Sequence, residues 1–279
     1  MTYENPYIIP VIRESYCAYV DILGIKKLIV KEFSRGSGRE LYNRFVGVLD
    51  KATEWSENVN LPGMEHLGRW ELRTFSDNYV WGYPIDERLY SVQFIAFLLF
   101  LSYFQAFMIA DEEFFIRGGI FSGSLIMDSN IVLGSALVEA YKLESEEAVN
   151  PRILISQEII SRIKQDVDIY NNQPGELFRR LILVDPDGHA FINYLSTTVF
   201  GPNSIEWDPL KKHKSVIENR LDQFKNEPKI CSKYAWVASY HNYCLESALK
   251  NSKYSDNTIE LRELIIDIQT KTLEFGEYK

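Results

Sequence analysis

The stretch CAYVDILGI, residues 17–25, decides the fold. Its first six residues are apolar apart from one acid, which predicts a short buried strand that ends near Asp21. Gly24 follows, and residues 25–30 predict a helix. Backbone amides at a helix N-terminus bind phosphate, and a glycine permits close approach. One turn therefore combines an acid with a candidate phosphate cradle.

A second acid stands in a predicted hairpin. Residues 70–75 alternate between apolar and polar side chains, and the pattern resumes at residues 79–83. The interruption at 76–78, SDN, is typical of a hairpin turn. Two carboxylates at the ends of adjacent strands, Asp21 and Asp77, have the oxygen ligands that a two-magnesium site requires. The alternative is that both are ordinary turn residues, because Asp is common at turns and helix N-caps.

The rest of the chain mixes strands with helices. Strands are predicted at 114–127, 151–156 and, as a hairpin with a Pro-Asp-Gly turn, 181–195, and helices at 39–59, 134–148 and 157–167. Beyond about residue 200 the pattern is helical and charged. This order predicts one α/β or α+β domain with a mostly antiparallel sheet, and it differs from a Rossmann alternation.

Residues 90–110 form an uncharged run of 21 residues, long enough to span a bilayer. The run includes four Ser and Gln side chains, and acids stand on both sides of it. A helix that is apolar all round is equally compatible with burial in a core or a dimer interface. Because Asp77 and Arg117 flank this helix and are expected in one compact domain, we expect no stable membrane insertion.

Charge and cysteine content limit the partners and the compartment. The net charge is −9, from 30 Lys and Arg against 39 Asp and Glu, which argues against nucleic acid as a partner. It does not argue against a nucleotide enzyme that holds phosphates through a metal ion. The three cysteines, Cys17, Cys231 and Cys244, have no CxxC spacing and predict neither a disulfide framework nor a zinc site. With no signal peptide apparent at the N-terminus, we expect a cytoplasmic protein.

Four segments together resemble the motifs of class III nucleotidyl cyclases in order and spacing. They are YVDILGI (19–25), FSDNY (75–79), FIRGGIFSG (115–123) and GSALVEAYKLE (134–144). In the second segment Ser76 replaces the usual glycine. Three more segments, at 140–144, 150–153 and 233–242, resemble the pyrimidine cyclases of bacterial anti-phage signalling, the Pycsar type.

The resemblance implies an architecture and an assembly. It implies the ferredoxin-like class III cyclase fold, an α+β fold with a mostly antiparallel sheet flanked by helices, over residues 15–200. Residues 201–279 would form a helical C-terminal extension that packs on this catalytic domain. The family also implies a head-to-tail homodimer with two active sites at the interface, so the helix at 90–110 would lie against the sheet or at the dimer contact.

The resemblance implies two divalent cations, Mn²⁺ or Mg²⁺, as cofactors. Asp21 and Asp77 match the two carboxylate ligands of the family, and the Ile22 carbonyl matches its backbone ligand. Gly24 would let the triphosphate approach the chain closely. Arg117 would contact phosphate, and the alternative is that it forms an ion pair within the protein or at the interface.

Other matched positions concern the base and the transition state. Arg73 stands where purine cyclases carry a Lys or Glu that reads the base, which favours another base, and Tyr42 could narrow the pocket. Ile131, at the place of a second polar reader, can make no hydrogen bond. Lys142 replaces the family's Arg at the α-phosphate and keeps its charge without the bidentate fork. Val138 replaces the Asn that orients the ribose.

The sequence-based hypothesis is a pyrimidine nucleotide cyclase that converts UTP to 3′,5′-cyclic UMP and pyrophosphate. The product would act on a separate cyclic-nucleotide-sensing effector in anti-phage defence. A guanidinium at position 73 can donate to uracil O4 but not to the cytosine amino group, which favours UTP slightly. The alternatives are a cyclase that makes cyclic CMP, a catalytically inactive nucleotide-binding domain, and a protein-interaction module built on the same sheet.

Overall fold

A 9-stranded sheet forms the centre of the computed structural model, which describes residues 11–58, 70–169, 173–198, 204–268 and 273–277. The strands are β1 (Arg13–Ile22), β2 (Glu71–Phe75), β3 (Asn78–Pro84), β4 (Ile116–Met127), β5 (Val132–Gly134), β6 (Ile153–Ile155), β7 (Ile182–Val184), β8 (Ala190–Ile192) and β9 (Gly276–Glu277). Their order is β2-β3-β1-β4-β6-β8-β7-β9, and β5 pairs with β4. Only the β4–β6 pair is parallel among the described strands. The predicted α+β class with a mostly antiparallel sheet is confirmed.

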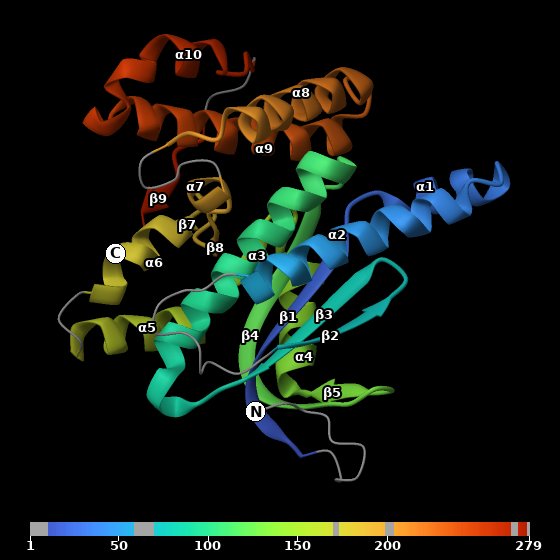
Figure 1. Ribbon diagram of the computed structural model, residues 1–279, viewed down its shortest axis with the longest axis vertical. Coiled ribbons are helices and arrows are strands. Elements are labelled where there is room, and N and C mark those ends of the chain that lie inside the picture. Colours follow the sequence, from blue (N-terminus) through green and yellow to red (C-terminus); the bar gives the residue numbers. More distant parts are fainter. Residues whose placement is uncertain (1–10, 59–69, 170–172, 199–203, 269–272, 278–279) are drawn as a thin grey trace.

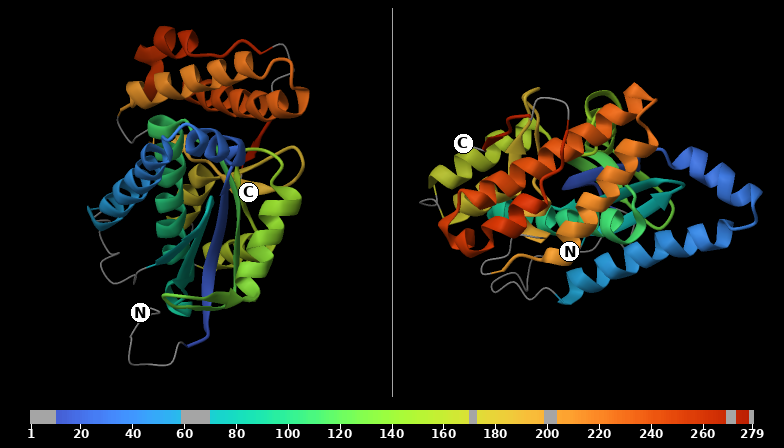
Figure 2. Two further views of the ribbon diagram at one scale, coloured as in Figure 1. Left: turned by 90° about the vertical axis from the view of Figure 1, so that its right-hand side faces the viewer. Right: turned by 90° about the horizontal axis from the view of Figure 1, so that it is seen from above.

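Helices cover both faces of this sheet (Figures 1 and 2). They are α1 (Ile25–Ser34), α2 (Gly38–Asn58), α3 (Tyr90–Glu112), α4 (Ser135–Lys142), α5 (Gln157–Ile169), α6 (Gln173–Leu181), α7 (Leu195–Thr198), α8 (Trp207–Gln223), α9 (Pro228–Leu249) and α10 (Thr258–Glu263). In the left view of Figure 2, α2 and α3 lie on one side of the strands and α4 lies on the other. The predicted helices are present, α6 and α7 were not predicted, and α10 lies in the region beyond residue 200 that was predicted to be helical.

The uncharged helix α3 is the main core helix. It packs its aromatic side chains against those of the central strands, with ring centroids 5.0 Å apart for Tyr16 and Phe94 and 4.8 Å apart for Trp81 and Phe104. The segment Glu87–Glu112 is the one helix in the described part of the chain that is long and apolar enough to cross a membrane, and 72% of its most apolar window is buried inside the protein. Its apolar character is therefore used in the core, against the sheet.

The opposite face of β1 and β4 packs against α4. A small second core there contains Cys17, Leu125, Met127, Ala136 and Ala140. The helix approaches β4 so closely that a Cβ atom on Gly119 would lie 2.5 Å from both the Ala140 carbonyl oxygen and the Leu143 Cβ. The glycine-rich middle of β4 is thus explained by the close approach of this helix.

Helices α8 and α9 lie across the end of α3, and a buried chain of hydrogen bonds joins them to the neighbouring elements (Figure 1). His241 Nε2 lies 3.0 Å from the Leu264 carbonyl oxygen, an acceptor, so this nitrogen carries the hydrogen. His241 Nδ1 then accepts from His213 Nδ1 at 3.0 Å, and His213 Nε2 accepts from the Tyr194 hydroxyl at 2.7 Å. The Leu264 carbonyl can only accept, and this fixes the tautomer of His241 and, through the hydrogen bond between the two rings, that of His213.

A buried ion pair makes a second connection to α9. Arg152, just before β6, pairs with Asp185 and Asp187 of the β7–β8 turn, and the Trp236 indole N–H donates to Asp185 at 2.8 Å. The segment at 185–188 is a tight turn, as predicted, with Gly188 in the left-handed region at φ 88°. The chain after residue 201 is largely helical, and it also returns to the sheet as β9, which pairs with β7.

The histidine chain predicts an acid-labile fold. Burial holds the pKa of His241 at about 4 and that of His213 well below its ordinary value of 6.5. The unfolded chain therefore binds protons below pH 6.5 that the folded chain does not bind. The free energy of unfolding should fall as the pH drops from about 6.5 to about 4, by up to about 1.4 kcal/mol per pH unit for each proton. Urea denaturation at a series of pH values measures this slope.

Two variants test whether His241 causes the pH dependence of the free energy of unfolding. His241→Gln keeps an N–H donor for the Leu264 carbonyl and cannot take up a proton, so the slope should become shallower. Ser34→Ala changes an exposed side chain that does not titrate, and it should leave the slope as it is. An unchanged slope in His241→Gln would contradict this assignment.

Candidate active site

Strand pairing brings the two predicted acids together. The last residues of β1 lie between β3 and β4, with Asp21 opposite Asn78 on one side and Arg117 on the other. Asp77 directly precedes Asn78, so its carboxyl lies beside that of Asp21. Asp77 is buried and the Asp21 side chain is 19% exposed. The two acids thus meet at the ends of the strands, where β1 ends and the β2–β3 hairpin turns, and the protein partly encloses them.

The hairpin turn that holds Asp77 is tight. Ser76 and Asp77 form its two central residues, while Asn78 already belongs to β3. Ser76 adopts φ 59°, in the left-handed region that glycine occupies most easily. The predicted turn is confirmed, and its backbone conformation accounts for the glycine that the cyclase motif has at this place.

The acid pair is electrostatically unfavourable in the absence of a cation. The pKa of Asp21 is raised to about 6, first by burial and then by the charge of Asp77 and a hydrogen bond with it, while Arg117 acts in the opposite direction. Two neighbouring carboxylates oppose each other's ionisation. A divalent cation removes the repulsion, and carboxylate oxygens are ligands that Mg²⁺ and Mn²⁺ prefer. The pair therefore fits a metal ion.

Protein carboxylates alone do not complete such a site. Within the described ranges there is no group of three or more His, Cys, Asp or Glu side chains that could hold a metal ion. The Ile22 carbonyl, next to Asp21 at the end of β1, is the further oxygen that the sequence motif assigns. A cation here would need substrate oxygens or water to fill its coordination, as Mg²⁺ usually does.

Arg117 is held by acids of the protein. Its Nε lies 2.7 Å from Glu144 Oε1 and 3.5 Å from Asp21 Oδ2. The N–H direction is not that of a hydrogen bond to Glu144, so the attraction is an ion pair. The structure shows Arg117 in an internal ion pair, which was the stated alternative, and its contact with phosphate stays a prediction. The physical reason for the ion pair is the place of Arg117 opposite Asp21, with the buried Glu144 on the adjacent α4 side.

Two charged residues at this site were not singled out from the sequence. Glu144 lies in a π turn, residues 143–147, that follows α4. Lys233 comes from α9, and burial lowers its pKa, as does the charge of Arg117, while Asp21 and Glu144 act in the opposite direction. Both lie in quoted segments, 134–144 and 233–242, but no sequence period distinguishes them from surface charges.

The predicted base readers lie on different faces. Arg73 of β2 is opposite Val80, which packs into the second core on the α4 face, and it donates to the Asp128 carbonyl at 2.6 Å. Tyr42 is 57% exposed on α2, across the sheet from α4. Within one chain Tyr42 and Arg73 thus lie on different faces of the sheet, and the role of Tyr42 in narrowing the pocket stays a prediction. The reason for its exposure is that Leu41 and Val48 face the core and turn Tyr42 to the solvent.

Lys142 lies at the C-terminal end of α4, and Gly24 lies just before the N-terminal end of α1. Lys142, the last residue of α4, is half exposed and pairs with Glu139 at 2.7 Å, so the chain does not direct it at its own acid pair. Gly24 precedes α1 with φ 74°, and a Cβ there would meet nothing within 4 Å. Glycine is thus required at this position by backbone conformation, and the amides of the first turn of α1 follow Asp21 by a few residues.

The chain resembles solved cyclase structures only distantly. A scan against protein-family models and a search of curated proteins gave no match. The guanylyl cyclase Cya2 is 16% identical with a TM-score of 0.35, and the match covers 55% of this chain and 79% of that one. A class III adenylyl cyclase-like ATP-binding protein from Pseudomonas aeruginosa is 13% identical with a TM-score of 0.36, over 56% of this chain and 36% of that one.

The geometry of the acid pair predicts a titration shift. In Asp77→Asn the neighbouring charge is gone and burial remains, so the pKa of Asp21 should fall from about 6 without losing its whole elevation. Carboxyl ¹³C chemical shifts recorded against pH measure this directly. The exposed Asp222 of α8 provides a control, because Asp222→Asn should leave the Asp21 titration in place. An Asp21 pKa that is equal in both variants would contradict the proximity of the two acids.

Proposed function

We propose that this protein is a nucleotidyl cyclase that uses two divalent cations. The observation that carries the proposal is the adjacency of Asp21 and Asp77 at the ends of paired strands, with the pKa of Asp21 raised to about 6. The Ile22 carbonyl would be the third protein ligand. The motif order of the sequence agrees with this site, because each quoted cyclase-like segment contributes to it or to the helix beside it.

The reaction is an intramolecular phosphoryl transfer. The ribose 3′-oxygen attacks the α-phosphorus, the bond to the pyrophosphate oxygen breaks, and the 3′-hydroxyl proton is released. Bound divalent cations supply charge neutralisation of the triphosphate and acidification of the 3′-hydroxyl. Asp21 and Asp77 would hold these cations, and Arg117 would orient Asp21 while it balances the buried Glu144. Lys142 stabilises the negative charge that develops on the phosphoryl group.

The substrate is proposed to be UTP, and CTP is the alternative. Arg73 would read the base, because a guanidinium can donate to a carbonyl oxygen of a pyrimidine. Ile131 at the second reading position is exposed and apolar, which offers nothing to the polar edge of a purine. Cyclic UMP would then serve as a second messenger for a separate effector in anti-phage defence, in the cytoplasm.

A head-to-tail homodimer is proposed as the active assembly. Large apolar side chains stand exposed on the β2–β3 hairpin tip, in and just before β5, and on α4: Phe75, Ile131, Leu133, Val138 and Tyr141. Burial of such side chains against a second copy is favourable. The same assembly would carry Lys142 of each chain to the acid pair of its partner, which accounts for the separation of Lys142 from the acids of its own chain.

The second candidate function is an inactive nucleotide-binding domain. It is favoured by Val138 in place of the family's Asn and by the pairing of Lys142 with Glu139. The retained acid pair favours the enzyme. A protein-interaction module would use the same exposed apolar side chains without needing either acid.

The direct test is incubation of the full chain with each of the four nucleoside triphosphates and Mn²⁺, followed by chromatography. We expect cyclic UMP and pyrophosphate. Asp77→Asn should abolish product formation without unfolding the chain, because one carboxylate ligand is lost, while Asp222→Asn should retain it. Nucleotide binding without product from any of the four would overturn the enzyme and support the binding domain.

A mixing experiment tests whether two chains share each site. Lys142→Gln alone should lower the rate by about 100-fold or more, as expected when a charge-stabilising group is removed. Mixed with Asp77→Asn, it should recover about a quarter of the wild-type rate, because half of the dimers are mixed and one of their two sites is intact. No recovery, with mixed dimers confirmed by mass spectrometry, would place Lys142 outside the shared site.

A further inference from the structure

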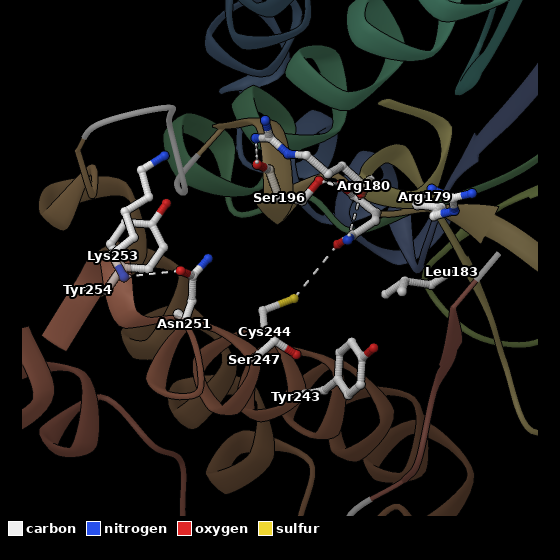
Figure 3. A pocket seen from close by; sticks show the side chains of 12 residues that line it. Arg179, Arg180, Leu183, Ser196, Tyr243, Cys244, Ser247, Asn251, Lys253 and Tyr254 are labelled. Atoms are coloured by element: carbon white, nitrogen blue, oxygen red, sulfur yellow. Dashed lines mark hydrogen bonds between the residues drawn. The ribbon is translucent and has the colours of Figure 1, made fainter. Parts of the chain in front are cut away.

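One cavity in the described part of the chain lies far along the sheet from the acid pair. It has a volume of about 320 Å³ and lies between α6, α7 and β7 on one side and the end of α9 on the other (Figure 3). That volume is at the lower end of the range found for small-molecule sites. The cavity contains neither Asp21 nor Asp77, so the proposed cyclase reaction does not use it.

The cavity is lined by cations from two separate parts of the chain. Arg179 and Arg180 come from the last turn of α6, and Lys253 follows α9 in the 3₁₀ segment Ser252–Asn257. None of the described lining residues is acidic, although the whole chain has a net charge of −9. Cations at a helix C-terminus are common because they oppose the helix dipole. That explanation applies to the two arginines of α6 but not to Lys253, which lies beyond the end of α9.

The three cations differ in position and in the contacts that hold them. Arg180 donates to the Ser196 carbonyl at 3.0 Å and is thereby anchored at the wall. Arg179 and Lys253 stand on opposite sides of the cavity, with Cys244 and Ser247 of α9 between them (Figure 3). An anion that reaches both side chains would neutralise them from two elements at once.

The polar and apolar parts of the lining suit an organic phosphate. Asn251 caps the 3₁₀ segment, because its side-chain oxygen accepts from the Lys253 backbone N–H at 3.1 Å. Its side-chain NH₂ group, the donor, therefore points away from that backbone N–H. Ser247 adds a hydroxyl, and Tyr243 and Leu183 provide apolar surface. Arginine binds phosphate oxygens through its planar fork and lysine binds them as a point charge.

We infer that this cavity binds a small anion that carries a phosphoryl group, held between Arg179 and Lys253. The inference is independent of the proposed function. A ligand here would connect α6, at the edge of the sheet, with the segment after α9, so it would stabilise the packing of the C-terminal helices. The chemistry is shared by free pyrophosphate and by a nucleoside monophosphate, and the two are separated by the choice of probe.

The test is isothermal titration of the full chain with inorganic pyrophosphate and with AMP, in EDTA and at constant ionic strength. The chain carries Asp77→Asn in every sample, so that binding at the acid pair does not contribute. We expect saturable binding with one site per chain and a melting temperature that rises with ligand concentration. A higher affinity for AMP assigns a nucleotide, and a higher affinity for pyrophosphate assigns a free phosphate.

Three further variants locate the binding. Arg179→Gln and Lys253→Gln should each weaken it by about tenfold or more, the loss of one charge-assisted contact. Lys250→Gln removes an exposed charge that is close in sequence and does not line the cavity, so it should bind like the parent. The inference is overturned if neither probe binds at millimolar concentration, or if all three variants bind alike.

Discussion

The pairing of β1 with β3 and β4 is the constraint on which the rest of the structure depends. It sets Asp21 in one row with Asn78 and Arg117, and it therefore determines which carboxylates meet. A register slip of one residue would turn the side chain of Asp21 to the face covered by α3. There it would be buried among aromatic rings without a charged partner, at a cost that no other contact of the strand could offset.

The elements that could be predicted are those whose own residues form a recognisable pattern. The Ser76–Asp77 turn, the strand that ends at Asp21 and the apolar helix α3 each follow from a pattern within a few residues. The direction in which a side chain points does not follow from such a local pattern. Tyr42 turns to the solvent because Leu41 and Val48 face the core, and Arg117 is held by Glu144 because α4 crosses β4 above Gly119. These are tertiary contacts, which a single sequence does not display.

Short elements escaped prediction for a related reason. The π turn that carries Glu144 and the two-residue strand β9 are too brief to have a period. Lys233 is one of many cations in a helical region, and only packing of α9 near β4 gives it charged neighbours. The candidate site was thus predictable in its carboxylates and its first turn, while the surrounding charges required three dimensions.

The strand β9 has a consequence for the integrity of the sheet. Within the described residues it pairs with β7 and lies outermost on that side, although the three C-terminal helices precede it in the chain. An uncovered β7 would present unpaired backbone groups to other chains, which is a common route to aggregation. The C-terminal segment therefore protects this edge of the sheet. The C-terminal helices cannot separate from the rest of the protein as an independent unit unless the pairing of β9 with β7 is also broken.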